Sequence, residues 1–269
     1  DEASRCTELI NTWIDDNPVN FGIGWEPYPT SLRIVNWIKW SINHSNFSFK
    51  HNYSLLLQTR ALNKKLEKHL LGNHILANAK ALIFSGLYFS GCEAKKWLQL
   101  GTKIISEELS EQILEDGAHF ELSPMYHSVI LEDLIDIFNI FKVFQVSSGR
   151  RHLQLIESIE AKISVMLIWL EEMIHPDEEI SFFNDSAIGI AHTFKDLKNY
   201  ALTSGIELKE KTISEDLSHL KDSGYIRLNL QDAIFLLDVA HVGPDYIPGH
   251  AHADTLSFEA SIHEKRLIV

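Results

Sequence analysis

The sequence predicts a mainly helical α+β protein, in which a helical domain over residues 1–208 precedes the first strands of an antiparallel β domain over residues 209–269. Up to about residue 204, apolar side chains recur at helical spacing in segments separated by turn residues. From Tyr225 onward the pattern changes to alternation and short apolar runs, which are typical of strands. Residues 266–269 look like a strand with nothing after it, so we expect a β domain that is truncated in this chain.

Several helices of the first domain are expected to begin or end at a cap, a glycine or a proline. The first one ends at Asn17-Pro18, because a residue before proline disfavours the helical conformation. The predicted helices span 4–16, 31–42, 49–71, 73–90, 93–113, 124–146, 152–174 and 193–204. The helix over 73–90 is apolar on nearly every side, which predicts burial among other helices. Helical hairpins wound into a toroid fit this pattern, although a plain bundle would show the same periodicities.

The strands of the second domain begin with an alternating stretch over 225–240, in which Gln231-Asp232 is expected to form a hairpin turn. Two more strands are expected over 255–262 and 265–269. A sheet of four or so strands follows from these segments.

The composition argues against two classes of partner. The chain has 269 residues and a net charge of −13, with no basic tract, so nucleic acid is not an expected partner. It has no run of 18 apolar residues, so no membrane-spanning helix is expected. The two cysteines, Cys6 and Cys92, show no metal or redox spacing.

The stretch over 243–259 is the strongest candidate for a functional site. Its glycines and prolines (Gly243, Pro244, Pro248 and Gly249) predict a turn. His250, His252 and Asp254 then alternate, and alternate residues of an extended chain point to the same side. Three such side chains on one face after a rigid turn indicate a site, although a polar strand face turned to water is the alternative.

Two further polar clusters lie where the helical pattern is interrupted, and scaffolds often present functional groups at such junctions. The first is Asn73 with its neighbours Gly72 and His74. The second, over 119–127, contains Glu121 and Tyr126. Each cluster also has a structural explanation. Asn73 can be a helix cap, the Tyr126 hydroxyl can bond to the backbone, and the histidines at 119 and 127 can be satisfied core residues.

Four motifs in this order resemble the heparinase II/III-type polysaccharide lyases. They are Gly-Asn-His-Ile-Leu-Ala-Asn-Ala-Lys-Ala-Leu (72–82), Glu-Leu-Ser-Pro-Met-Tyr-His (121–127), Phe-Phe-Asn-Asp-Ser (182–186) and Gly-His-Ala-His-Ala-Asp-Thr-Leu-Ser-Phe-Glu (249–259). Residues 25–37 also resemble the subgroup linked to bacterial surface-polysaccharide genes. The resemblance implies an incomplete α/α toroid followed by an antiparallel β-sandwich, with the cleft between them.

The resemblance also implies eliminative cleavage of a glycosidic bond beside a uronic acid, as found in alginate and glycosaminoglycans. It implies that Asn73 neutralises the uronate carboxylate with help from His74. Tyr126 would be the catalytic acid and a candidate for the base, and His250 would complete the site from the β domain. His252 would be one ligand of a structural divalent metal, zinc in several relatives, with most ligands outside this chain. No organic cofactor is implied.

These residue types suit the chemistry of elimination. The proton removed lies next to a carboxylate and is barely acidic, and its removal adds negative charge to that group. An amide or imidazole N–H can hold this charge without adding a charge of its own. A tyrosine can take or give a proton when nearby positive groups lower its pKa. Arg33, Lys39 and Arg60 are the candidates for such groups.

Some residues are expected to bind the sugar rather than react with it. Trp25 and Tyr28 can stack on sugar faces, whereas Trp37 and Trp40 are better explained by core packing. The substrate-binding candidates are Trp25, Tyr28, Arg33, Glu121 and His127.

Two other functions stay open at this point. A glycoside hydrolase on an α/α scaffold would use Glu121 and Asp185, and the separation of the two carboxyls would test it. A non-catalytic glycan-binding protein could keep the same scaffold. The expected partner is an acidic polysaccharide in the periplasm or outside a bacterial cell, with a cytoplasmic location and the oligomeric state left open. Because more metal ligands and a further catalytic tyrosine are expected beyond residue 269, the activity of this chain alone is also open.

Overall fold

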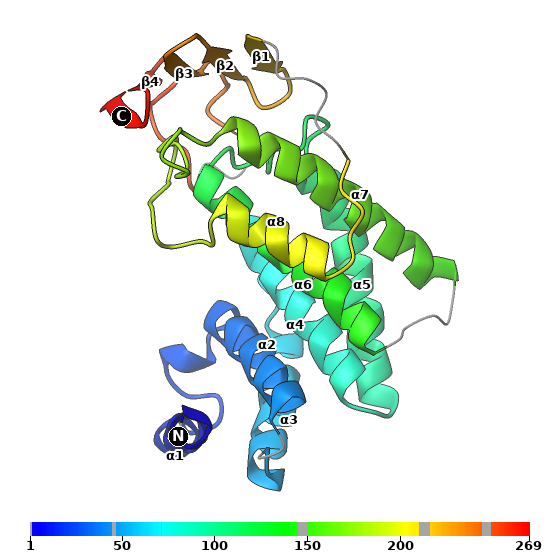
Figure 1. The fold of residues 1–269 in the computed structure, drawn as a ribbon. Coiled ribbons are helices and arrows are strands. Elements are labelled where there is room, and N and C mark those ends of the chain that lie inside the picture. The colour runs from blue at the N-terminus through cyan, green and yellow to red at the C-terminus, as the bar shows by residue number, and fades with distance from the viewer. Residues whose placement is uncertain (1, 45–46, 71, 145–149, 210–215, 244–248) are drawn as a thin grey trace. The chain divides into compact units, whose positions relative to one another are not determined.

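The computed structural model describes residues 2–44, 47–70, 72–144, 150–209, 216–243 and 249–269 (Figure 1). Pro244 and Pro248, which were expected to shape the turn before His250, lie outside these residues. The chain forms two compact units, residues 1–105 and 106–269, and each is described by itself. Among the described residues, no helix combines the length and the apolar character that crossing a bilayer requires.

The first unit is helical. Its elements are α1 (Glu2–Asp16), the 3₁₀ turn η1 (Ile23–Trp25), α2 (Pro27–Asn43), α3 (Phe49–Lys64), α4 (Gly72–Tyr88) and the first part of α5 (Cys92–Gln112). α4 is buried almost throughout, as its apolar composition predicts. Two glycines let α5 pack tightly against it. A Cβ at Gly86 would lie 2.6 Å from the Leu98 nitrogen, and one at Gly101 would lie 2.8 Å from the Ala79 carbonyl oxygen.

α3 is shorter than the sequence predicts. It ends at Lys64, not at residue 71, and Leu70 is 45% exposed instead of lying on a buried stripe. A side chain of α4 captures the backbone that follows. Asn78 accepts a hydrogen bond from the Glu67 N–H at 2.9 Å and donates one to the Glu67 carboxylate at 3.0 Å. These contacts give residues 65–70 hydrogen bonds that replace those of a helix. Local helix propensity does not reveal them, because they come from another helix.

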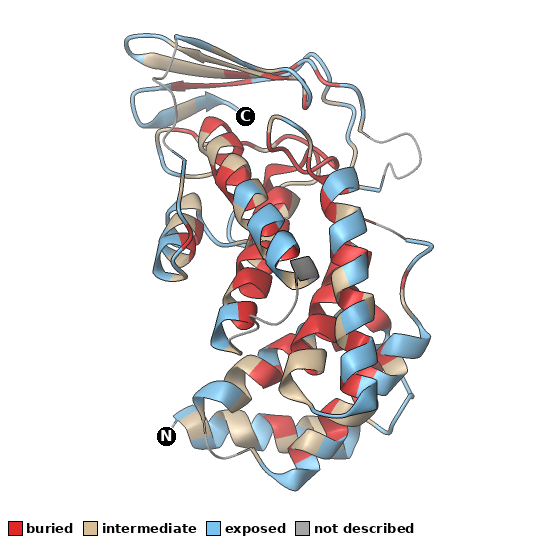
Figure 2. Ribbon diagram, turned by 90° about the vertical axis from the view of Figure 1, so that its right-hand side faces the viewer, coloured by how far each residue is buried: buried red, intermediate tan, exposed pale blue. Residues whose placement is uncertain are grey.

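The second unit begins with the end of α5 and contains α6 (Pro124–Val143), α7 (Arg150–Glu172) and α8 (Phe194–Thr203). α6 begins where the sequence predicts, because Ser123 caps it and Pro124 occupies its first turn. Thr193 caps α8 in the same way. More residues are buried in α6 than in α7 or α8. Buried residues form stripes along the helices of the ribbon (Figure 2).

Five antiparallel strands follow α8 and pair in sequence order. They are β1 (Leu217–Leu220), β2 (Tyr225–Asn229), β3 (Ala233–Asp238), β4 (Phe258–Ile262) and β5 (Lys265–Ile268). The hairpin turn at 231–232 is confirmed, since Asn229 pairs with Ile234 across it. β1 was not expected from the sequence.

The expected strand over 255–262 begins only at Phe258, so His250, His252 and Asp254 do not alternate along a strand. Leu256 has a φ of 71°, which is incompatible with an extended chain. Its N–H donates to the Asp238 carbonyl at 2.7 Å, which turns the backbone toward β3. The alternation in the sequence is therefore not a sheet face.

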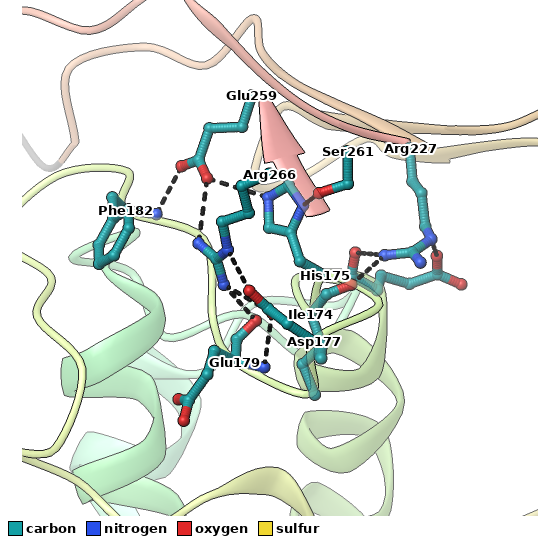
Figure 3. A network of polar contacts seen from close by, with 10 residues as sticks. Ile174, His175, Asp177, Glu179, Phe182, Arg227, Glu259, Ser261 and Arg266 are labelled. Atoms are coloured by element: carbon teal, nitrogen blue, oxygen red, sulfur yellow. Dashed lines mark hydrogen bonds and ion pairs between the residues drawn. The ribbon is translucent and has the colours of Figure 1, made fainter. Parts of the chain in front are cut away.

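A buried polar network joins the sheet to the segment that follows α7 (Figure 3). His175 is 2% exposed, and its Nε2 and Nδ1 lie 2.9 Å from Glu259 Oε2 and 2.7 Å from Ser261 Oγ. The other Glu259 oxygen accepts a hydrogen bond from the Phe182 N–H at 2.5 Å. Because Phe182 begins the segment over 182–186, named here the 182–186 loop, this network anchors the loop to β4.

Two arginines of the sheet reinforce the same junction (Figure 3). Arg227 donates to the carbonyls of Glu172 and Ile174 at 2.8 and 2.7 Å, which satisfies acceptors at the end of α7. Arg266 binds both carboxylate oxygens of Asp177, at 2.8 and 3.1 Å. Bidentate pairs of this kind fix orientation as well as distance.

Candidate active site

The second unit brings together two of the four predicted catalytic residues, Tyr126 and His250. Their ring centroids are 3.7 Å apart and the ring planes are 31° from parallel. Tyr126 lies in the first turn of α6, where its N–H donates to the capping hydroxyl of Ser123 at 3.2 Å. The cap therefore sets the position of the tyrosine relative to the segment that carries the histidine.

The 182–186 loop supplies the polar surroundings of this pair. Asp185 Oδ2 lies 2.9 Å from His250 Nδ1, and the Asp185 N–H donates to the His250 carbonyl at 3.1 Å. The Ser123 hydroxyl donates to the Asp185 carbonyl at 2.8 Å and lies 2.9 Å from the hydroxyl of Ser186. The residue that caps the helix of Tyr126 thus also holds the loop that contacts His250.

Asn184 holds the 182–186 loop in place from inside. It is 6% exposed, and its side-chain amide donates to the Leu122 carbonyl and to the Tyr225 hydroxyl, both at 3.1 Å. Its side-chain oxygen accepts from the His252 N–H at 3.0 Å, and its own N–H donates to Asp254 at 2.6 Å. One buried asparagine therefore connects the loop to the start of α6, to β2 and to the segment before β4.

The surroundings of Tyr126 favour the protonated phenol. Burial raises the pKa of Tyr126 above 10.0, and the carboxylates of Asp185 and Glu121 raise it further. Positive groups were expected to lower this pKa, but the carboxylates of Asp185 and Glu121 have the opposite sign. A protonated phenol suits the role of proton donor and not that of base.

Glu121 and His127, two of the predicted substrate-binding residues, lie in the interior of this unit. Their exposures are 4% and 0%. His127 Nδ1 accepts from the His119 N–H at 3.2 Å, and its Nε2 lies 3.0 Å from the Met166 carbonyl, to which it can only donate. Both ring nitrogens are satisfied in the neutral form. Burial lowers the pKa of His127 to about 3, and burial also lowers the pKa of His119 well below 6.5.

These buried histidines predict that the free energy of unfolding falls as the pH is lowered from 6.5 toward 3. In that window the unfolded chain binds protons at His119 and His127 that the folded chain excludes. Each group is expected to remove about 1 kcal/mol per pH unit. Urea unfolding at a series of pH values measures the slope. His127→Gln should flatten it, whereas His263→Gln, at a ring that is 73% exposed, should not. A slope that His127→Gln leaves unchanged would contradict the assignment.

His252 does not form a metal site with the residues that the structure describes. Asp254, the nearest acidic residue in sequence, is engaged by the Asn184 N–H. No group of three His, Cys, Asp or Glu side chains in the described ranges could hold a metal ion. A tetrahedral zinc site needs more protein donors than this one histidine.

The other predicted catalytic residues, Asn73 and His74, lie in the first turn of α4 in the first unit. Because α4 begins at Gly72, Asn73 is inside the helix and is not its cap. Asn73 is 5% exposed. The His74 ring lies 4.6 Å from that of Tyr28, and its Nδ1 lies 3.2 Å from Glu67 Oε1. Tyr28 and His74 are therefore neighbours, with Glu67 orienting the imidazole.

The remaining candidates of the first unit belong to an aromatic cluster. Trp25 is 5% exposed and lies 5.8 Å from Trp13, which also contacts Trp37 at 5.5 Å. The Arg33 guanidinium sits 3.7 Å over the Trp13 ring and donates to Gln58 at 2.8 Å. Burial lowers the pKa of Arg33 to about 10. Packing explains the position of Trp25 better than stacking on a sugar does.

The sequence does not predict what Ser123 and Asn184 do, and it suggests Asp185 only as a carboxylate of the hydrolase alternative. All three lie within or beside the quoted motifs over 121–127 and 182–186. A motif singles out such residues, but it does not show which side chains they contact.

Comparisons with known proteins cover almost the whole chain. The family model described as Heparinase II/III N-terminus matches residues 7–205. The model described as Heparinase II/III-like, C-terminal, matches residues 212–269.

Curated relatives carry the name heparin-sulfate lyase. The one from Bacteroides thetaiotaomicron is 26% identical over 231 residues, which is 81% of this chain and 32% of that protein. The one from Bacteroides stercoris is 29% identical over 132 residues, which is 48% of this chain and 18% of that protein. The chain thus aligns with at most about a third of these relatives.

Solved structures show the same fold. A heparinase III structure matches with a TM-score of 0.75 and 22% identity, over 96% of this chain and 45% of that one. The heparan sulfate lyase HepC from Pedobacter heparinus matches with a TM-score of 0.60 and 20% identity, over 98% of this chain and 44% of that one. The chain spans less than half of each structure, and its fold is an α/α toroid followed by the opening of an antiparallel β-sandwich.

Proposed function

The chain belongs to the heparinase II/III family, and from this premise we propose that the full-length protein is a polysaccharide lyase that cleaves a glycosaminoglycan by β-elimination beside a uronic acid. The names of the curated relatives favour a polymer of the heparan sulfate class. The observation that carries the proposal is the close contact between the Tyr126 and His250 rings. The carboxylate of Asp185 lies against Nδ1 of the same imidazole and not against Nε2.

In β-elimination the proton at C5 of the uronate goes to a base, the C4–O bond breaks and a C4=C5 double bond forms. The departing oxygen must receive a proton. Tyr126 suits this role because burial and the nearby carboxylates raise its pKa and keep the phenol protonated. His250 is the neighbouring group that can accept a proton. We further propose that Asn73 and His74 hold the charge that builds on the uronate carboxylate, because an amide or imidazole N–H can do so without adding a charge of its own.

A substrate panel tests the proposal on the full-length protein. Heparan sulfate, heparin, chondroitin sulfate, hyaluronan and alginate are each incubated with the protein, while ultraviolet absorbance of the conjugated double bond and new reducing ends are followed together. A rise in both signals on a glycosaminoglycan is expected. A rise on alginate alone would keep the elimination and change the substrate class.

New reducing ends without absorbance would overturn the lyase in favour of a hydrolase. The structure does not favour that alternative, because Glu121 is 4% exposed and lies 3.7 Å from His119. A glycosidase acid must reach the scissile oxygen. Neither signal on any polymer, with binding retained, would overturn catalysis in favour of a glycan-binding protein.

A further inference from the structure

We propose that Asp185 is a positioning residue for His250. Its carboxylate selects one orientation and one tautomer of the imidazole, with the hydrogen on Nδ1 and Nε2 left free. A carboxylate oxygen only accepts hydrogen bonds, so the 2.9 Å contact between Asp185 Oδ2 and His250 Nδ1 requires an N–H at that nitrogen. The kinetic part of this inference rests on the proposed function, and the structural part does not.

Two contacts together define how the imidazole lies. The Tyr126 ring stacks on it at 3.7 Å and restricts the plane of the ring. Stacking alone still allows the imidazole to turn by 180° about its Cβ–Cγ bond. That turn would exchange the positions of the ring nitrogen and carbon atoms. Only a polar contact at one edge distinguishes the two orientations, and Asp185 is the side chain that makes it. In a neutral histidine, the hydrogen bond made by one ring nitrogen determines which of the two nitrogens carries the hydrogen.

Backbone contacts hold Asp185, the residue that carries the carboxylate, in place. The Asp185 N–H binds the carbonyl of His250, and its carbonyl accepts from the hydroxyl of Ser123. Asn184, the preceding residue, is buried and bonded on all its polar atoms. This rigid support places a half-exposed carboxylate against a less exposed ring, with side-chain exposures of 47% and 20%. A carboxylate held in this way can be replaced without disturbing the core.

The alternative is an ordinary surface ion pair between Asp185 and a protonated His250. Such pairs contribute about 0–1 kcal/mol and carry no role in catalysis. The chain offers a pair of that kind for comparison. Asp232 Oδ1 lies 3.9 Å from His263 Nδ1, with side-chain exposures of 64% and 73%. The two pairs have the same residue types in the same unit, and only the first touches Tyr126 through its histidine.

The kinetic test compares Asp185→Ala, Asp185→Asn and Asp232→Asn in the full-length protein, on the polymer that the panel identifies. Both Asp185 variants are expected to lower kcat by about 10²-fold with little change in KM, by analogy with orienting carboxylates elsewhere. Added formate should restore part of the rate of Asp185→Ala, because it can occupy the open carboxylate position. Formate should not restore Asp185→Asn, whose amide fills that position. Asp232→Asn should match the wild type.

The second test needs no activity. Histidine labelled with ¹⁵N, with the His250 signals assigned by loss in His250→Gln, reports which ring nitrogen carries the hydrogen. The wild type should show the Nδ1–H form at neutral pH, and Asp185→Asn should lose that preference because its amide can donate to the ring. His263 should not change in the Asp185 variants.

The outcomes separate the two proposals. Loss of kcat with formate rescue, together with the tautomer change, supports the positioning role. Asp185 variants within twofold of the wild-type kcat, or a loss of rate that follows loss of thermal stability and is not rescued by formate, would overturn it. If no polymer yields an unsaturated product, the proposed function fails, and the tautomer of His250 still decides whether Asp185 orients it.

Discussion

Tyr126→Phe is expected to reduce the kcat of the full-length protein by about 10²- to 10⁴-fold, the usual contribution of a general acid. The variant removes the phenol that burial and the carboxylates of Asp185 and Glu121 keep protonated. It keeps the aromatic ring that stacks on His250 at 3.7 Å, so the fold and the imidazole should stay in place. The initial rise in ultraviolet absorbance on the preferred polymer measures the effect.

The control for this variant is Tyr53→Phe. Tyr53 lies on α3, is 51% exposed and stacks on Phe49 at 6.1 Å, and the proposed reaction assigns no step to its hydroxyl. Its kcat should equal that of the wild type. If Tyr126→Phe keeps more than a tenth of the wild-type kcat, the assignment of Tyr126 as the acid is wrong.

Asn184→Ala is expected to lower the free energy of unfolding by roughly 3 kcal/mol or more. The change removes the asparagine contacts of two buried groups, the Leu122 carbonyl and the Tyr225 hydroxyl, and of the partly buried His252 N–H. It also places alanine at a φ of 56°, which costs about 1–2 kcal/mol in the left-handed region. Urea unfolding of the wild type and the variant measures the difference.

Two variants separate the side-chain and backbone parts of this effect. Asn184→Gly removes the same side-chain bonds without the left-handed strain, so it should be less destabilising than Asn184→Ala by about 1 kcal/mol. Asn20→Ala repeats the backbone change at an exposed asparagine with a φ of 63°. If Asn20→Ala and Asn184→Ala lower the free energy of unfolding equally, the side-chain hydrogen bonds of Asn184 contribute nothing. Those bonds would then not be what holds the 182–186 loop.

Much of the fold follows from local chemistry. Ser123-Pro124 predicts the start of α6, because a capping hydroxyl and a proline both favour the first turn of a helix. Gln231-Asp232 predicts the hairpin between β2 and β3 in the same manner. Two predictions differ from the structure for the same reason, namely the helix expected to continue to residue 71 and the strand expected to begin at residue 255. Residues 65–70 and 250–257 have periodic sequences, but side-chain and backbone contacts from other elements hold them in turns.

Residue patterns predicted most of the helices, four of the five strands, the resemblance to the family and the place of Tyr126 in the first turn of a helix. The same patterns do not predict that Asp185 reaches His250, 65 residues later in the chain, or that Asn184 binds residues 62 positions before it and 41 after it. Helix and strand patterns depend on neighbours a few positions apart. Contacts between distant loops depend on how those elements pack. Packing also buries Trp25 and His127, two of the predicted substrate-binding residues, because burial is a property of the assembled core.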